Sequence, residues 1–133
     1  SALMLSAAGG VRRENGSTPG TPFDRGAGRL DVGRAALAGL VLDETYAGFL
    51  AANPAAGGDP SALNLPALVS SRCAATCVFS RTLRNSLPIT TTWSASASGG
   101  GPLALAVEPA SFALGPGERR TVAVTARIGE ATE

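Results

Sequence analysis

Histidine and lysine are both missing from this chain of 133 residues, in which all eleven basic residues are arginine. Without histidine, a serine or cysteine nucleophile lacks its usual general base, and a metal site lacks its commonest ligand. Aromatic residues make up only 5% of the sequence, and the scattered arginines leave a net charge of +1. A nucleic-acid-binding surface needs a basic face, usually with stacking aromatic residues, so this function is disfavoured. No apolar run approaches the ~18–20 residues that a membrane-spanning helix needs.

Only two cysteines are present, Cys73 and Cys77. A structural zinc ion takes four ligands, and two thiols without histidine cannot supply them, so a disulfide is favoured over a metal site. A disulfide implies an oxidising compartment and therefore a secreted protein. Bridged cysteines have Cα atoms ~4.4–6.8 Å apart, whereas a five-residue strand would hold them about 13 Å apart. The segment is therefore predicted to turn tightly, and so short a loop contributes only about 2 kcal/mol of stability.

The first part of the sequence has helical and loop character. Residues 1–8 are rich in Ala, Leu and Met and resemble the last turns of a buried helix whose beginning is cut away. Residues 11–21 carry turn signals and predict a surface loop. A short helix is predicted over 31–40 with Asp31 as its N-cap, and the apolar patch over 46–50 is compatible with a second helix.

Beyond a linker-like stretch at 53–60, the pattern changes to alternation of period two. Residues 89–93 are rich in β-forming side chains, and strict alternation occurs over residues 77–83, 103–107 and 121–128. This pattern is typical of antiparallel strands with one buried face. We therefore predict a mainly β fold, in which an antiparallel β-sandwich over 57–133 follows a partly helical, loop-rich arm over 1–56.

Seven short runs along the chain are informative because of their order. They are 1–7 (SALMLSA), 22–28 (PFDRGAG), 39–43 (GLVLD), Tyr46 with Phe49-Leu50, Asp59 with 63–66 (LNLP), 81–85 (RTLRN) and 108–114 (EPASFAL). In this order they resemble the C-terminal region of subtilisin-like serine proteases, downstream of the catalytic serine. The last two runs resemble parts of that family's fibronectin-type-III-like domain. Arg29 and Gly33 depart from the family pattern, which commonly has His and Pro at these positions.

The resemblance implies that the family's catalytic Asp, His and Ser all lie upstream of Ser1, so no catalytic residue carries over to this chain. We expect a non-catalytic region, without cofactor or metal ion, of a parent protein that hydrolyses peptide bonds. Its expected partner is the parent's own catalytic domain, which it would stabilise or on which it would shape substrate access. The abundance of Ala, Gly and Arg suggests a GC-rich coding sequence, and hence a secreted bacterial protein.

The apolar residues of the arm need a partner. Six of them are expected inside or at the edge of the parent's catalytic domain: Leu3, Met4, Leu5, Phe23, Leu30 and Leu37. Without that partner they either dock on the sandwich or pack against a second copy, because exposed apolar surface is costly. We favour a homodimer through residues 1–56.

Other residues allow two interpretations. An exposed Trp93 could stack on a sugar, which would make the chain a carbohydrate- or surface-binding accessory module, but packing in the core is favoured. Four aspartates have no spacing that would gather calcium ligands, and helix caps or turns explain them better: Asp24, Asp31, Asp43 and Asp59. The pairs Arg12-Arg13 and Arg119-Arg120 are interpreted as solvated loop charges.

Overall fold

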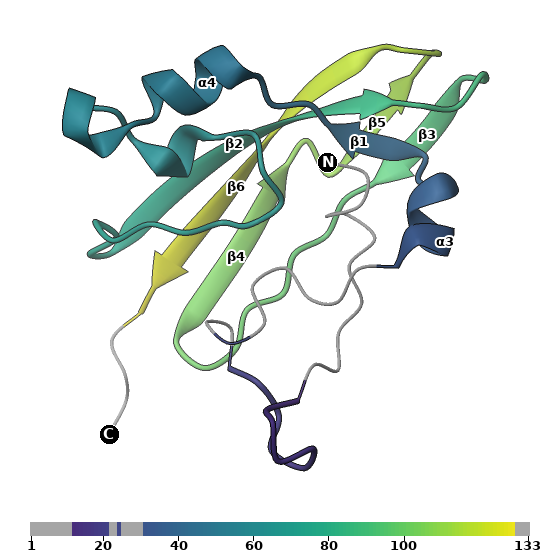
Figure 1. Ribbon diagram of the computed structural model, residues 1–133. Helices are drawn as coiled ribbons and strands as arrows, with labels where there is room; N and C mark the ends of the chain where they lie inside the picture. Colours follow the sequence, from purple (N-terminus) through teal and green to yellow (C-terminus); the bar gives the residue numbers. More distant parts are fainter. Residues whose placement is uncertain (1–11, 22–23, 25–30, 130–133) are drawn as a thin grey trace.

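The computed structural model describes residues 12–21, 24 and 31–129. The helix expected at 1–8 and most of the run at 22–28 lie outside these residues, as does Leu30. The described part is mainly β, with a four-stranded antiparallel sheet in the order β1-β2-β6-β4 and a two-stranded antiparallel sheet of β3 and β5 (Figure 1). The strands are β1 (Leu40–Leu42), β2 (Thr76–Asn85), β3 (Thr91–Ser94), β4 (Leu103–Glu108), β5 (Ser111–Leu114) and β6 (Arg119–Ile128). The predicted fold class is confirmed.

The long pairing of β2 with β6 forms the centre of the larger sheet. It runs in register from Thr76 opposite Arg127 to Arg84 opposite Arg119. Because side chains alternate between the two faces of a strand, Phe79 and Arg81 of β2 point to the same face, and both are buried. The period-two alternation therefore identified this strand, and the structure shows which of its faces is buried.

The hydrophobic core lies between the two sheets. Phe112 and Leu114 from β5 meet Val122 from β6, and all three are buried. Five partly buried side chains pack around them: Leu40, Leu83, Trp93, Ala95 and Val107. Trp93 is thus a core residue, as the sequence favoured, because β3 directs its indole ring toward the larger sheet.

Two short helices lie on either side of β1 along the chain. In α3 (Val32–Ala36) the Asp31 side chain accepts a hydrogen bond from the Arg34 N–H at 3.0 Å, and in α4 (Tyr46–Ala51) the Thr45 side chain accepts one from the Gly48 N–H at 3.0 Å. Such caps satisfy the free N–H groups of a first helical turn. Both expected helices are present and Asp31 caps the first as predicted, but α3 ends at Ala36, and Leu40, which was included in the predicted helix, begins β1.

The linker-like stretch at 53–60 and the residues directly after it contain two 3₁₀ turns. They are η1 (Pro54–Ala56) and η2 (Pro60–Ala62), each with proline in its first turn. Asn53 and Asp59 cap them through their side-chain oxygens. Proline tolerates this position because its missing N–H would have no partner inside the helix.

β1 extends the larger sheet to residues that precede the expected boundary at 57. Leu40, Val41 and Leu42 pair with Asn85, Arg84 and Leu83, and Val41 and Leu42 are buried. The division into 1–56 and 57–133 stays a prediction, but one strand of the four-stranded sheet comes from the arm.

The interpretation of Arg119 and Arg120 as loop charges is wrong. Both lie in β6, which begins directly after a tight turn. In that turn Gly117 has a φ of 74°, and the Glu118 side chain accepts a hydrogen bond from the Gly115 N–H at 2.6 Å. Because glycine adopts this left-handed backbone without strain, the turn ends at Glu118 and the strand starts one residue later.

Candidate functional site: exposed apolar helices on a polar base

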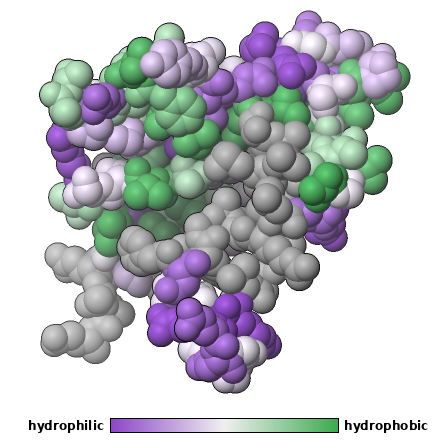
Figure 2. Space-filling model, viewed as in Figure 1, coloured by the Kyte–Doolittle hydropathy of each residue, from purple (hydrophilic) through white to green (hydrophobic). Residues whose placement is uncertain are grey.

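The two helices expose large apolar side chains to solvent. Five residues, here called the apolar helix surface, are exposed by 49–84%: Val32, Leu37, Tyr46, Phe49 and Leu50. Apolar side chains are visible over the α3 and α4 regions in Figure 2. Single exposed apolar residues are normal on soluble proteins, but several on two short helices point to an interaction surface.

A stretch of chain from residue 44 to residue 64, here called the α4 excursion, leaves the sheet and returns to it. Asn64 closes its base, because its N–H donates to the Glu44 carboxylate at 2.6 Å and its side-chain amide donates to the Asp43 carbonyl at 3.1 Å. The same side chain also pairs with both backbone groups of Thr82 in β2, at 2.7 and 2.8 Å. The Asn64 amide thus continues the hydrogen bonding of the β2 edge beyond the end of β1.

Glu44 occupies space that a side chain at Gly48 would need. A Cβ atom at Gly48 would lie 2.1 Å from Oε1 of Glu44. The carboxylate accepts hydrogen bonds from the N–H groups of Asn64 and Thr45, which hold the pKa of Glu44 below its usual value. A glycine inside α4, normally unfavourable, is therefore explained by the carboxylate that folds back against it.

Asp43 joins three strands at the base of the α4 excursion. Its Oδ2 accepts hydrogen bonds from Arg84 of β2 at 2.7 Å and from Arg119 of β6 at 3.0 Å. The hydrogen bond from Arg84 is the main reason that the pKa of Asp43 is lowered, with partial burial opposing and Arg119 adding to the effect. Asp43, placed after β1 in the chain, thus ties the start of the excursion to the sheet.

Two polar side chains are buried in the described part, and both belong to the run at 81–85. Asn85 is fully buried and donates to the carbonyls of Ile89, Leu114 and Gly115, at 2.9–3.1 Å. Its side-chain oxygen accepts a hydrogen bond from the Leu87 N–H. A buried amide is stable only when its groups are paired, and here the pairing links the larger sheet to β5.

Arg81, the second buried polar side chain, contacts the return path of the α4 excursion. Its guanidinium donates to the carbonyls of Ser61, Leu65 and Ala67. Arg81, Asn85 and Asn64 were visible in the sequence only as letters of runs that resemble a family. The sequence offered one hint that they are structurally important: each is a polar residue within a segment that alternates regularly or contains turn residues.

The turn after α3, at Gly39, packs against the smaller sheet. We call this turn the root of α3. Gly39 lies so close to the Trp93 ring that a Cβ atom there would be 2.6 Å from Cη2. The N–H of Ser86, the residue directly after β2, donates to the Gly39 carbonyl at 3.0 Å and fixes the same point. The Trp93 ring therefore packs against Gly39 and the core. Its Nε1 is buried without a hydrogen-bond partner in the described part.

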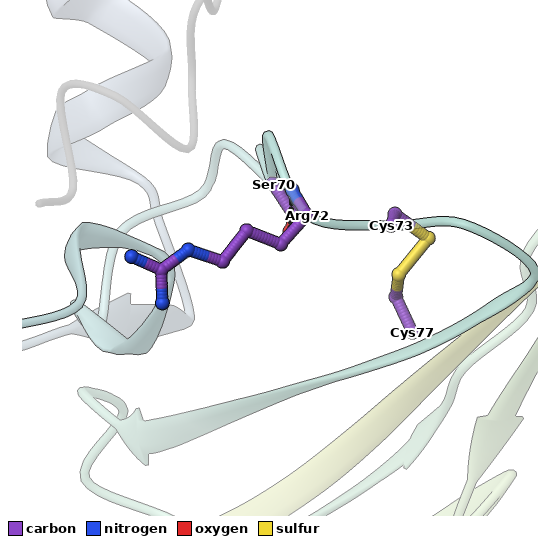
Figure 3. The surroundings of a disulfide bond; sticks show 4 residues. All are labelled: Ser70, Arg72, Cys73 and Cys77. Atoms are coloured by element: carbon purple, nitrogen blue, oxygen red, sulfur yellow. Dashed lines mark hydrogen bonds between the residues drawn. A yellow bond between two sulfur atoms is a disulfide. The ribbon is translucent and has the colours of Figure 1, made fainter.

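Cys73 and Cys77 are joined in a disulfide at the start of β2 (Figure 3). Their Cα atoms lie 5.7 Å apart, so the intervening residues turn tightly as the spacing required. The Ala75 carbonyl within this turn accepts a hydrogen bond from Ile128 at the end of β6. In Figure 3 the Arg72 side chain extends away from the disulfide.

The four aspartates act as hydrogen-bond acceptors, three of them locally in caps and turns as expected, whereas Asp43 binds arginines far away in the chain, so the expectation that a cap or turn explains it is wrong. Asp31 and Asp59 cap α3 and η2, Asp43 binds two arginines, and Asp24 accepts from Thr21 and Arg13. Hydrogen bonds from Thr21 and Arg13 lower the pKa of Asp24. Within residues 12–21, 24 and 31–129, no three acidic or cysteine side chains come together in a way that could hold a metal ion. The helices described there are all too short to cross a bilayer.

Comparison with known proteins connects this chain to one protease. It is 28% identical over 127 aligned residues to subtilisin-like protease SBT2.5 of Arabidopsis thaliana. The alignment covers 81% of this chain but only 16% of that protein. No model of a protein family matches the chain. Most of the chain is therefore related in sequence to a small part of a subtilisin-like protease.

Proposed function

We propose that this chain is the non-catalytic C-terminal region of a secreted subtilisin-like serine endopeptidase. In this proposal its β-sandwich docks on the parent's catalytic domain and stabilises it or shapes substrate access. The observation that carries the proposal is the apolar helix surface, the large apolar side chains that α3 and α4 leave exposed to solvent. The sequence similarity to a plant protease indicates which kind of partner would cover it.

The energy available from such docking is large enough to matter. Burial of one large apolar side chain contributes about 1.5–3 kcal/mol. Leu37, Tyr46 and Val32 are 84%, 78% and 70% exposed, so most of this contribution is still to be gained. A stable interface buries roughly 800 Å² on each partner. The exposed α4 side chains Tyr46, Phe49 and Leu50 would supply the apolar part of such an interface.

Two further parts of the proposal depend on other observations. The disulfide supports an oxidising, extracellular location, because cytosolic proteins rarely keep disulfides. A bacterial source is suggested only by composition, and the similar protease is from a plant. A carbohydrate-binding role is less well supported, because Trp93, the side chain that suggested it, packs against Gly39 and the core.

The first test is the sequence that precedes Ser1 in the gene. The proposal requires a catalytic domain there, with the family's Asp, His and Ser in that order. The second test compares two double variants of the longer protein. Y46S/F49S alters α4, whereas V78S/I89S alters two residues that are similarly exposed, at 62% and 63%, but lie elsewhere.

We expect Y46S/F49S to shorten the half-life of protease activity at elevated temperature by at least 10-fold, with V78S/I89S close to wild type. Equal half-lives for the two variants would contradict docking through α4. A homodimer is the competing occupant of the same surface. If light scattering shows that the longer protein is monomeric and Y46S/F49S still loses stability, contact within one chain explains the result and a dimer does not.

A further inference from the structure

Arg81 is a buried cation whose hydrogen bonds all end on main-chain carbonyls. It is 6% exposed. Its Nε donates to Leu65 at 2.5 Å, and its Nη2 donates to Ala67 at 2.8 Å. Its Nη1 donates to Ser61 at 3.2 Å and to Ser80 at 2.7 Å. No carboxylate of the described residues forms an ion pair with it.

Such an arrangement needs carbonyl groups that converge on one point. A buried charge is costly unless its donors are satisfied, and a guanidinium presents five donors in a rigid planar fork. Burial lowers the pKa of Arg81, yet an arginine stays protonated, so the carbonyl dipoles must balance the charge. The Phe79 ring, with its centroid 5.9 Å from Cζ of Arg81, adds a weak cation–π contact.

Three of the four carbonyls belong to one segment. Residues 61–67 supply them at 61, 65 and 67, so this segment folds around the guanidinium. The segment begins in η2 and includes Asn64, which closes the α4 excursion. Its path therefore determines where the excursion returns to β2.

We propose that Arg81 is a positioning residue that fixes the return leg of the α4 excursion and, through it, the direction in which α4 presents Tyr46, Phe49 and Leu50. The docking part of this inference rests on the proposed function, whereas the local ordering of 61–67 does not. Arg81 holds the leg from the inner face of the sheet, while Asn64 holds it at the strand edge. Neither contact alone restricts both the position and the rotation of the segment.

The test uses amide hydrogen exchange of the full chain with R81K and R81M. Lysine keeps the charge but lacks the planar fork, so R81K loses the simultaneous contacts to 61, 65 and 67. Arg127, an exposed residue of β6, provides the control variant R127M. We expect R81K to speed exchange within 61–67 and α4 by about 10-fold to 100-fold while amides of the β2–β6 pairing keep their protection, and R127M to change neither.

Several outcomes would overturn the inference. Exchange in 61–67 that is unchanged in R81K would show that the carbonyls do not need the fork. A uniform loss of protection across β2 and β6, or failure of both R81K and R81M to fold, would assign Arg81 to global stability instead. The R81K variant of the longer protease then separates the two proposals. If wild type shows no stabilisation by the apolar helix surface, the proposed function fails while the exchange result stands. If R81K shows faster exchange in 61–67 but the longer protease is stabilised as much in R81K as in wild type, the positioning role fails.

Discussion

Replacement of Gly39 by alanine tests how tightly the root of α3 is bound to the core. The new Cβ atom would lie 2.6 Å from Cη2 of Trp93, 3.1 Å from Cζ2 and 3.2 Å from Cδ1 of Leu87. Carbon atoms prefer separations of about 3.5–4.0 Å, so the indole ring must move by roughly 1 Å. Because Trp93 packs against the buried residues Phe112, Leu114 and Val122, that movement disturbs the core itself.

Overpacking of this kind costs about 1–3 kcal/mol. For a chain of this size we therefore expect the melting temperature of G39A to fall by about 4–12 °C, with urea unfolding moving in the same direction. The control is G100A, because a Cβ atom at Gly100 meets nothing within 4 Å and no left-handed backbone is required there. This control should match wild type or be slightly more stable.

A double variant completes the test. W93F removes the atoms that a Cβ at position 39 would strike, at the cost of a cavity. The destabilisation by G39A should therefore be smaller in the W93F background, with an interaction energy of about 1 kcal/mol or more. If G39A and G100A unfold at the same denaturant concentration, Gly39 and Trp93 are not in close contact and the reasoning is refuted.

Three further outcomes are expected. Titration of the denatured, unreduced chain should find no free thiol. C73S/C77S should lower the free energy of unfolding by only about 2 kcal/mol. A failure of this variant to fold would contradict the description of the disulfide as a local staple. Asp43 has its pKa lowered in the folded state, so its stabilising contribution is complete above the unfolded value near 3.8 and is lost as the pH falls through the folded pKa. Urea unfolding of wild type between pH 5 and pH 2 should therefore lose more stability than that of D43N, and parallel curves would show that Arg84 and Arg119 do not hold the carboxylate. Serine-directed fluorophosphonate reagents should leave the isolated chain unlabelled, because it has no histidine to activate a serine, and stoichiometric labelling would show an unforeseen nucleophile.

Local patterns in the sequence predicted most of the secondary structure. Alternation located β2, β4 and β6, and the Asp31 cap located α3, because side-chain alternation and helix capping depend on residues only a few positions apart. The resemblance to a protease family indicated the two successive strands β4 and β5, which the structure places in different sheets. β1 was missed as a strand of the sheet, since three residues are too short to show a period and it forms only by pairing with residues 83–85.

The candidate site depends on contacts that no local pattern contains. Arg119 meets Asp43 across 76 positions of the chain, and Arg81 reaches the Leu65 carbonyl across 16. The sequence by itself determined, through alternation, that Arg81 shares a face of β2 with Phe79. That this face is buried was decided by the tertiary structure. What satisfies that charge, and where the α4 excursion returns, was decided only by the tertiary structure. The physical reason is that a buried guanidinium is stable only where several carbonyls converge, and carbonyls converge only when distant segments pack together.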